Sequence, residues 1–196
     1  TRGAVAAIRA AKAAGTKNVT AEVSVQHFAL TDEECFGYNT DAKMYPPLRS
    51  QEHLDAIIEA IKDGTIDALT TDHAPHIEPD KLLPFEHAAM GSVGLETSLA
   101  VMYTYLVKPG HVSLADGIAL MTHKPTAIIR SDRGTLSEGA PADITLFDLS
   151  EEWVVDPTKF ESKGKNCVFK GKELTGKAKY VIVGGEVKMR GGDILQ

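Results

Sequence analysis

Apolar side chains recur at helical and strand spacing along the first part of the chain. Residues 4–11 carry apolar side chains at helical spacing, and Gly15 follows as a C-terminal stop, so we expect an opening helix. Residues 18–25 alternate apolar and polar side chains, which predicts a short strand. After a polar loop, Ser50 is an N-cap candidate for a helix whose apolar stripe covers residues 54–61.

A second cycle of strand and helix places polar residues at the end of a strand. Residues 66–69 predict a brief buried strand that runs directly into the polar segment 70–76. Residues 95–106 predict a long apolar helix, and residues 113–116 form a capping-box-like start to another. This alternation is typical of an α/β fold with a parallel sheet or barrel, in which functional residues gather at the carboxyl ends of the strands. Residues 70–76 occupy that position.

The pattern changes near residue 134. Beyond it the sequence turns to short β runs bounded by Gly and Pro, of which residues 143–147 and 180–183 are the clearest. We therefore predict two domains, a helical and parallel-stranded part over residues 1–134 and a β-rich part over residues 135–196.

Two further features of the second part have simple structural interpretations. Gly184-Gly185 and Gly191-Gly192 lack the strand-to-helix context of a phosphate-binding loop, so we expect hairpin turns. Trp153 and Phe160 are expected to pack the β-rich domain rather than bind a ligand.

Composition excludes several classes of function. Lys and Arg number 21 against 27 Asp and Glu, a net charge of −6, and no basic cluster appears, so nucleic acid is not expected as a partner. The apolar runs fall far short of the roughly 20 residues that span a bilayer, so no membrane segment is expected. Cys35 and Cys167 are too few for a disulfide framework and are not spaced as a metal site, which favours free thiols in a reducing, cytoplasmic compartment.

The strongest chemical signal is the segment Asp72-His73-Ala74-Pro75-His76. A carboxylate directly after a buried strand can ligate a metal ion with one oxygen and exchange a proton with bound water through the other. The simpler alternative is that Asp72 caps the following segment, while His73 and His76 are surface residues. Composition and spacing leave both interpretations open.

The run from Thr70 to His76, Thr-Thr-Asp-His-Ala-Pro-His, resembles the last metal-site motif of the dihydroorotases of the amidohydrolase superfamily. Three more segments look like dihydroorotase segments in the right order: Pro46-Pro47-Leu48-Arg49, residues 93–97 and residues 139–143. Hydantoinases and allantoinases share the Thr-Asp-His start, and His76 favours dihydroorotase among these relatives.

The resemblance implies the C-terminal portion of a (β/α)8 barrel, followed by part of a small β-sandwich domain. It implies reversible hydrolysis of (S)-dihydroorotate to N-carbamoyl-L-aspartate in pyrimidine biosynthesis, with a binuclear zinc centre. Asp72 would ligate one zinc and carry the proton of the zinc-bound hydroxide to the leaving nitrogen, and His76 would contact the substrate. Gly91 matches a loop whose backbone amide approaches the substrate, although turn geometry explains Gly91 and Gly94 equally well.

Three residues depart from the family pattern. Tyr45 stands where a substrate-binding Asn commonly precedes the Pro-Pro-Leu-Arg motif, so that contact is either made by a phenol or lost. Residues 25–27, Val-Gln-His, stand where many relatives have Pro-His-His, so His27 matches the second histidine. We expect His27 to pack against or support neighbouring residues rather than to ligate a metal. Met90 replaces a common Phe, which would soften the apolar wall of the pocket.

The largest departure is length. In the family, the remaining zinc ligands precede the point at which this chain starts, and Asp72 alone cannot hold zinc. We therefore expect the C-terminal part of a dihydroorotase that is inactive and metal-poor by itself. The competing interpretation is a dihydroorotase-like subunit that lacks catalysis and scaffolds a partner such as aspartate transcarbamoylase. Association into a homo-oligomer is also open.

Overall fold

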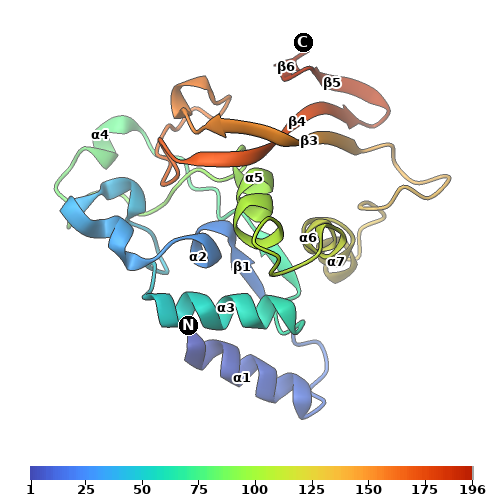
Figure 1. Ribbon diagram of the computed structural model, residues 1–196, viewed down its shortest axis with the longest axis horizontal. Helices are drawn as coiled ribbons and strands as arrows, with labels where there is room; N and C mark the ends of the chain where they lie inside the picture. The colour runs from blue at the N-terminus through green and yellow to red at the C-terminus, as the bar shows by residue number, and fades with distance from the viewer. Residues whose placement is uncertain (196) are drawn as a thin grey trace.

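The computed structural model describes residues 1–195, and its helices lie between and beside two unequal sheets (Figure 1). Helices α1 and α3 run along one side of the molecule, and the large antiparallel sheet lies on the opposite side. The small sheet β1–β2, together with α2 and α5, occupies the space between these layers. The predicted α/β class is confirmed.

The elements follow one another along the chain, and the longest connections lie between α4 and α5, between α7 and β3, and between η4 and β4. The helices are α1 (Arg2–Ala13), α2 (Val25–Ala29), the 3-10 helices η1 (Asp32–Tyr38) and η2 (Thr40–Ala42), α3 (Gln51–Lys62), α4 (Glu78–Lys81), α5 (Ser98–Met102), the π-helix η3 (Tyr103–Val107), α6 (Leu114–Met121), α7 (His123–Ile128) and the 3-10 helix η4 (Pro157–Lys159). The strands are β1 (Glu22–Ser24), β2 (Ala68–Thr70), β3 (Ile144–Val154), β4 (Glu173–Val183), β5 (Glu186–Arg190) and β6 (Asp193–Ile194).

The first helix ends as predicted, and the first strand is shorter than predicted. Gly15, at φ 75°, follows α1, and the amide of Thr16 donates to the carbonyl of Ala11 at 3.1 Å, which closes the helix in a Schellman pattern. The strand expected over residues 18–25 is only three residues long. Asn18 has a left-handed φ of 61°, which interrupts the extended backbone, and Val25 already begins α2.

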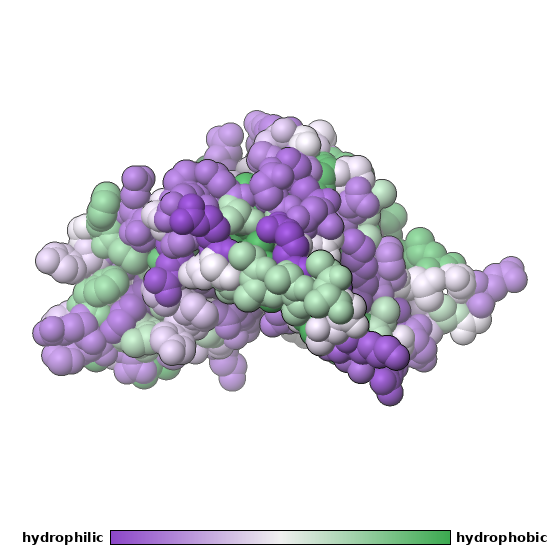
Figure 2. Space-filling view, turned by 90° about the horizontal axis from the view of Figure 1, so that it is seen from below, coloured by the Kyte–Doolittle hydropathy of each residue, from purple (hydrophilic) through white to green (hydrophobic). Residues whose placement is uncertain are grey.

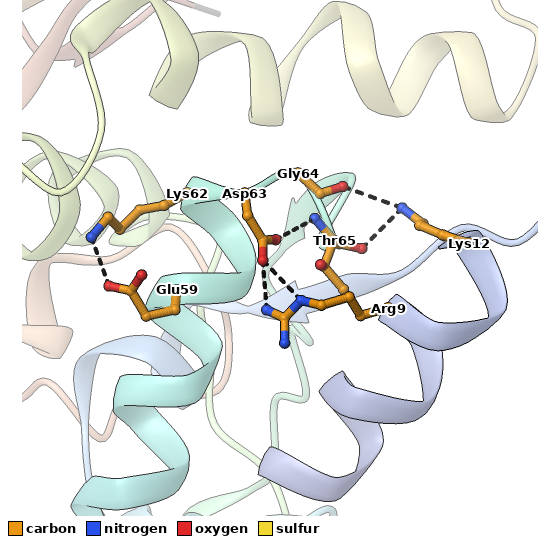
Figure 3. Close-up of polar contacts among 7 residues, drawn as sticks. All are labelled: Arg9, Lys12, Glu59, Lys62, Asp63, Gly64 and Thr65. Atoms are coloured by element: carbon orange, nitrogen blue, oxygen red, sulfur yellow. Dashed lines mark hydrogen bonds and ion pairs between the residues drawn. The ribbon is translucent and has the colours of Figure 1, made fainter. Parts of the chain in front are cut away.

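Polar contacts fasten α1 to the end of α3 (Figure 3). The Arg9 guanidinium donates to the Asp63 carboxylate at 2.6 and 2.9 Å, and Lys12 Nζ donates to the carbonyl oxygens of Gly64 at 3.3 Å and Thr65 at 2.9 Å. Lys12 Nζ also pairs with the half-buried Asp67 carboxylate at 2.6 Å. These contacts position the turn that leads from α3 into β2.

Strands β1 and β2 form a parallel pair, with Val23 opposite Leu69 and Ser24 opposite Thr70. Helix α3, which lies between these two strands in the sequence, buries Leu54, Ile57 and Ile61 of the apolar stripe that the sequence predicts. A parallel pair joined through a helix is the unit whose carboxyl ends commonly carry function.

The long apolar helix predicted over residues 95–106 begins later, as α5, and continues as the π-helix η3 through Val107. Its buried side packs beneath β4, where the amide of Thr175 donates to Thr104 Oγ1 at 2.9 Å. The predicted capping-box-like start of α6 is confirmed, since Ser113 Oγ accepts from the amide of Asp116 at 3.1 Å and donates to the Asp116 carboxylate at 2.6 Å.

Strands β3, β4, β5 and β6 form one antiparallel sheet in sequential order. Strand β4 extends well beyond the predicted run, because its first half pairs with β3 while its second half also pairs with β5. The two glycine pairs are hairpin turns as predicted, and all four glycines have positive φ.

The hydrophobic core is continuous across residue 134. Phe169 and Leu174, from the β-rich part, are almost fully buried in one cluster with Val101 and Leu106 of the helical part. Trp153 and Phe160 pack partly buried against this cluster, as predicted. The two predicted domains therefore share a core in this chain.

Seen from the side of α1, polar side chains mix with smaller apolar areas over the surface (Figure 2). Among residues 1–195, no helix has the length and apolar character needed to cross a membrane.

Candidate functional site

Asp72 lies two residues beyond Thr70, the last residue of β2, at the carboxyl end of the strand. Its backbone adopts a left-handed φ of 46°, a conformation that Asp tolerates better than most residues other than Gly and Asn. The residue is exposed. It lines a cleft of about 540 Å³ together with residues from β1, α2, α3 and the segment 45–49. The ionisable and hydroxyl side chains along this cleft include those of Glu22, Ser24, His27, Tyr45, Arg49 and Asp72.

His27 is held by both of its ring nitrogens. Ser24 Oγ lies 2.6 Å from Nδ1, and the carbonyl oxygen of Pro46 lies 2.9 Å from Nε2. Burial lowers the pKa of His27, although the Pro46 carbonyl and the charge of Asp72 act in the opposite direction. With both nitrogens bonded inside the chain, His27 supports the wall of the cleft, which agrees with its expected role.

The lowered pKa of His27 predicts that the chain loses stability in mild acid. Between the pKa of folded His27 and about 6.5, the ordinary value, the unfolded chain binds a proton that the folded chain does not. The free energy of unfolding should therefore fall as pH drops below about 6.5. Urea unfolding at pH 7.5 and 5.5 should show this loss in the native chain and a smaller loss in His27→Gln; parallel losses in both proteins would contradict the assignment.

His73 and His76 do not line the cleft. They belong to a neighbouring hydrogen-bonded cluster, in which the loop of residues 73–76 contacts the loop of residues 90–95. His73 Nδ1 accepts hydrogen bonds from the amides of Gly94 at 3.2 Å and Leu95 at 3.4 Å. This arrangement requires the proton of a neutral His73 to reside on Nε2. His73 is therefore partly buried and bonded, which differs from the simple surface residue of the alternative interpretation.

His76 is fixed at both its backbone and its ring. Its Nε2 lies 2.9 Å from the carbonyl oxygen of Met90, and its amide donates to Asn166 Oδ1 at 2.9 Å. Met90 contacts His76 through its backbone carbonyl, while the residue as a whole is 51% exposed.

Gly91 allows the loop carrying Met90 to approach His76. Its φ is 141°, and a Cβ there would lie 2.5 Å from the Cβ of Ala74 and 3.1 Å from His76 Nε2. Its amide donates to the carbonyl of Lys43 at 2.8 Å. Close packing and backbone conformation thus explain the glycine without a ligand.

Gly94 is a packing glycine, and its substitution gives a second testable prediction. A Cβ there would lie 2.6 Å from the carbonyl oxygen of Thr71, one residue before Asp72. Gly94→Ala should cost about 1–3 kcal/mol of unfolding free energy, because backbone must move. The matched control is Gly3→Ala in α1, where a Cβ meets nothing within 4 Å, and which should be neutral or slightly stabilising in the same urea titration. Equal effects of the two substitutions would contradict the packing argument.

Three residues that the sequence motifs did not indicate organise this cluster. The buried side chain of Asn166 bonds the loop of His76, and the buried Nζ of Lys81 donates to the carbonyls of Ala89 and Gly91. Lys43 Nζ donates to the carbonyl of Ala88 at 2.7 Å. Burial lowers the pKa of Lys81, partly offset by the nearby carboxylate of Asp41. Asn166 lies 90 residues beyond His76, whereas Lys81 lies only five residues beyond it. Periodicity carries no signal for either partner, because both are polar residues whose bonds form only in the folded chain.

The donor set for a metal is incomplete within residues 1–195. No group of three or more His, Cys, Asp and Glu side chains in this range could hold an ion. Asp72, exposed in the cleft, can supply one carboxylate ligand, whereas catalytic zinc takes about three protein ligands. The described chain therefore fits one ligand of a zinc centre and not the whole centre.

The family model for amidohydrolases, described as "Amidohydrolase family", matches residues 2–188. The chain belongs to the amidohydrolase family. It is 49% identical over 183 residues to a dihydroorotase of Ruminiclostridium cellulolyticum, covering 93% of this chain and 42% of that protein. It is 46% identical to a dihydroorotase of a Thermoanaerobacter species, covering 97% of this chain and 44% of the relative.

Solved structures of amidohydrolase relatives share the fold. The L-hydantoinase (dihydropyrimidinase) of Arthrobacter aurescens superposes with a TM-score of 0.92 at 32% identity, covering 100% of this chain and 44% of that one. The D-hydantoinase of a Thermus species gives a TM-score of 0.90 at 26% identity, covering 98% and 43%. The chain thus spans less than half the length of these relatives.

Proposed function

We propose that this amidohydrolase chain is part of a zinc-dependent dihydroorotase, which interconverts (S)-dihydroorotate and N-carbamoyl-L-aspartate in pyrimidine biosynthesis. The observation that carries the proposal is Asp72, an exposed carboxylate at the carboxyl end of β2 on the wall of a cleft. High identity to two dihydroorotases over nearly the whole chain supports this substrate class.

In the proposed reaction Asp72 moves a proton. Its carboxylate would take a proton from the attacking water and deliver it to the ring nitrogen that leaves when the cyclic amide opens. A bound zinc centre would polarise the ring carbonyl and acidify that water, with Asp72 as one of its ligands. The other ligands would come from the preceding part of the complete protein.

His76 is proposed to bind the carboxylate or carbonyl of the substrate. Nε2 donates to the Met90 carbonyl, so Nδ1 is the ring nitrogen that remains for the substrate, and it donates to a carboxylate or carbonyl only in the imidazolium form. Gly91 is proposed to bring its loop close to the substrate, and Met90 to form part of the apolar wall. Tyr45, 78% exposed on the rim of the cleft, is proposed to replace the amide of the family with a phenol donor.

The finer architecture is also proposed. Residues 1–134 would be the C-terminal part of a (β/α)8 barrel, and residues 135–196 part of a small β-sandwich domain. We propose a cytoplasmic location, with a small-molecule substrate and with association into a homo-oligomer or with aspartate transcarbamoylase as the open alternatives.

The competing function is a scaffold without catalysis, and Tyr45 is the residue that favours it, because it removes an expected amide contact.

The test uses the extended protein, in which the N-terminal segment of a dihydroorotase relative is fused to the N-terminus of this chain. Dihydroorotate, hydantoin and allantoin are offered in turn. Ring opening of dihydroorotate above the other two supports the proposal; preference for hydantoin or allantoin points to those related activities; silence with all three supports the scaffold.

A further inference from the structure

We propose that Asn166 is the positioning residue of His76, and that the β-rich part of the chain thereby sets the geometry of the substrate site. The inference rests on the proposed function, in which His76 contacts the substrate. Asn166 lies 90 residues beyond His76, and its side chain is buried at 5% exposure.

Three hydrogen bonds join the Asn166 side chain to the two loops of the cluster. Its Oδ1 accepts from the amide of His76 at 2.9 Å, and its Nδ2 donates to the carbonyls of Ala74 at 2.9 Å and Gly91 at 3.0 Å. An amide side chain offers one acceptor group and two donors, so this set of partners fixes its orientation. No other uncharged side chain of this size can supply both kinds of bond here.

The contacts hold His76 from two directions. The bonds to the His76 amide and the Ala74 carbonyl fix the backbone that carries the imidazole. The bond to the Gly91 carbonyl fixes the residue next to Met90, whose own carbonyl accepts from His76 Nε2. Lys81 Nζ donates to the same Gly91 carbonyl at 3.0 Å and strengthens this side of the arrangement.

Asn166 is itself held in place. Its carbonyl accepts from the amide of Val93 at 2.8 Å, and the amide of Val168 donates to Ser92 Oγ at 3.0 Å. The following residues, Cys167 to Phe169, are buried in the core. Gly164 allows the approach, because a Cβ there would lie 2.7 Å from the Cβ of Pro75. Packing in the core thus holds Asn166 in place, and the hydrogen bonds of Asn166 hold His76.

The first test reads the His76 ring directly, without activity. In the 196-residue chain, ¹⁵N NMR of the imidazole should show the tautomer protonated at Nε2. Asn166→Ala should shift the ring toward a mixture of tautomers, because the Met90 carbonyl is no longer held opposite Nε2. Asn166→Asp keeps the size and the acceptor but removes both donors, so it should show the same shift. If the alanine variant does not fold, Asn166→Asp provides the test instead. Asn39→Asp, on an exposed asparagine that only accepts from the Asp41 amide, makes the same charge change and should leave the ring unchanged.

The second test separates positioning from a general loss of structure. In the extended protein, Asn166→Asp should lower kcat/KM for dihydroorotate by about 10- to 100-fold, mainly through a higher KM. In a His76→Ala background the same substitution should have little further effect. An unchanged His76 tautomer, or equal effects of Asn166→Asp with and without His76, would overturn the proposal. Absence of activity in the unmodified extended protein would instead count against the proposed function and would leave the NMR result standing.

Discussion

Replacing Asp72 by Asn should lower the rate of dihydroorotate ring opening in the extended protein by about 10²- to 10⁴-fold, the usual contribution of a positioned acid or base. The amide cannot accept and return a proton, but it has nearly the same size. Because Asn tolerates the left-handed φ of 46° at this position, the fold should be retained. Steady-state kinetics on the purified variant give the measurement, and a thermal melt confirms folding.

The control for this substitution is Asp132→Asn, an exposed carboxylate outside the cleft, which removes the same charge. It should keep activity near that of the unmodified protein. Comparable losses in both variants would show that net charge matters rather than a proton carried by Asp72. Full activity of Asp72→Asn would remove Asp72 from the reaction.

Replacing Phe169 by Ala should cost about 3–5 kcal/mol of unfolding free energy, the range for truncation of a buried aromatic side chain. Phe169 is 1% exposed and lies with its ring centroid 6.4 Å from that of Tyr105 in the helical part. Since the two parts share this core, we expect one cooperative transition in urea, shifted as a whole by the substitution.

Phe36→Ala provides the matched control, because Phe36 is 77% exposed. It should change the unfolding free energy by less than about 0.5 kcal/mol. Two transitions, of which only one responds to Phe169→Ala, would contradict the shared core and would support two independently folding units on either side of residue 134.

Local patterns predicted the elements whose signals are local. The helix over residues 54–61 follows from its apolar stripe, and Asp72 was correctly expected to follow a buried strand, because strand and motif adjoin in sequence. Residues 25–42 were expected to be strand end and polar loop, yet they form α2, η1 and η2. Helix α2 packs against α3, and η1 packs against η2, so these short helices depend on contacts that apolar periodicity in the sequence does not show.

The candidate site shows the same limit more sharply. The motif indicated His76, but its partner Asn166 lies 90 residues away and is found only once the chain is folded. The close approach of Gly91 to Ala74 likewise depends on two loops that are distant in sequence. Hydrogen bonds of this kind are long-range, and they follow from the packing of the β-rich part on the helical part.

The most direct test of the account is zinc content measured together with dihydroorotate ring opening, on the 196-residue chain beside the extended protein. We predict about two zinc ions and turnover in the extended protein only, because residues 1–195 hold no group of three or more His, Cys, Asp and Glu side chains that could bind an ion. Turnover by the 196-residue chain alone, or zinc and turnover missing from both proteins, would contradict it.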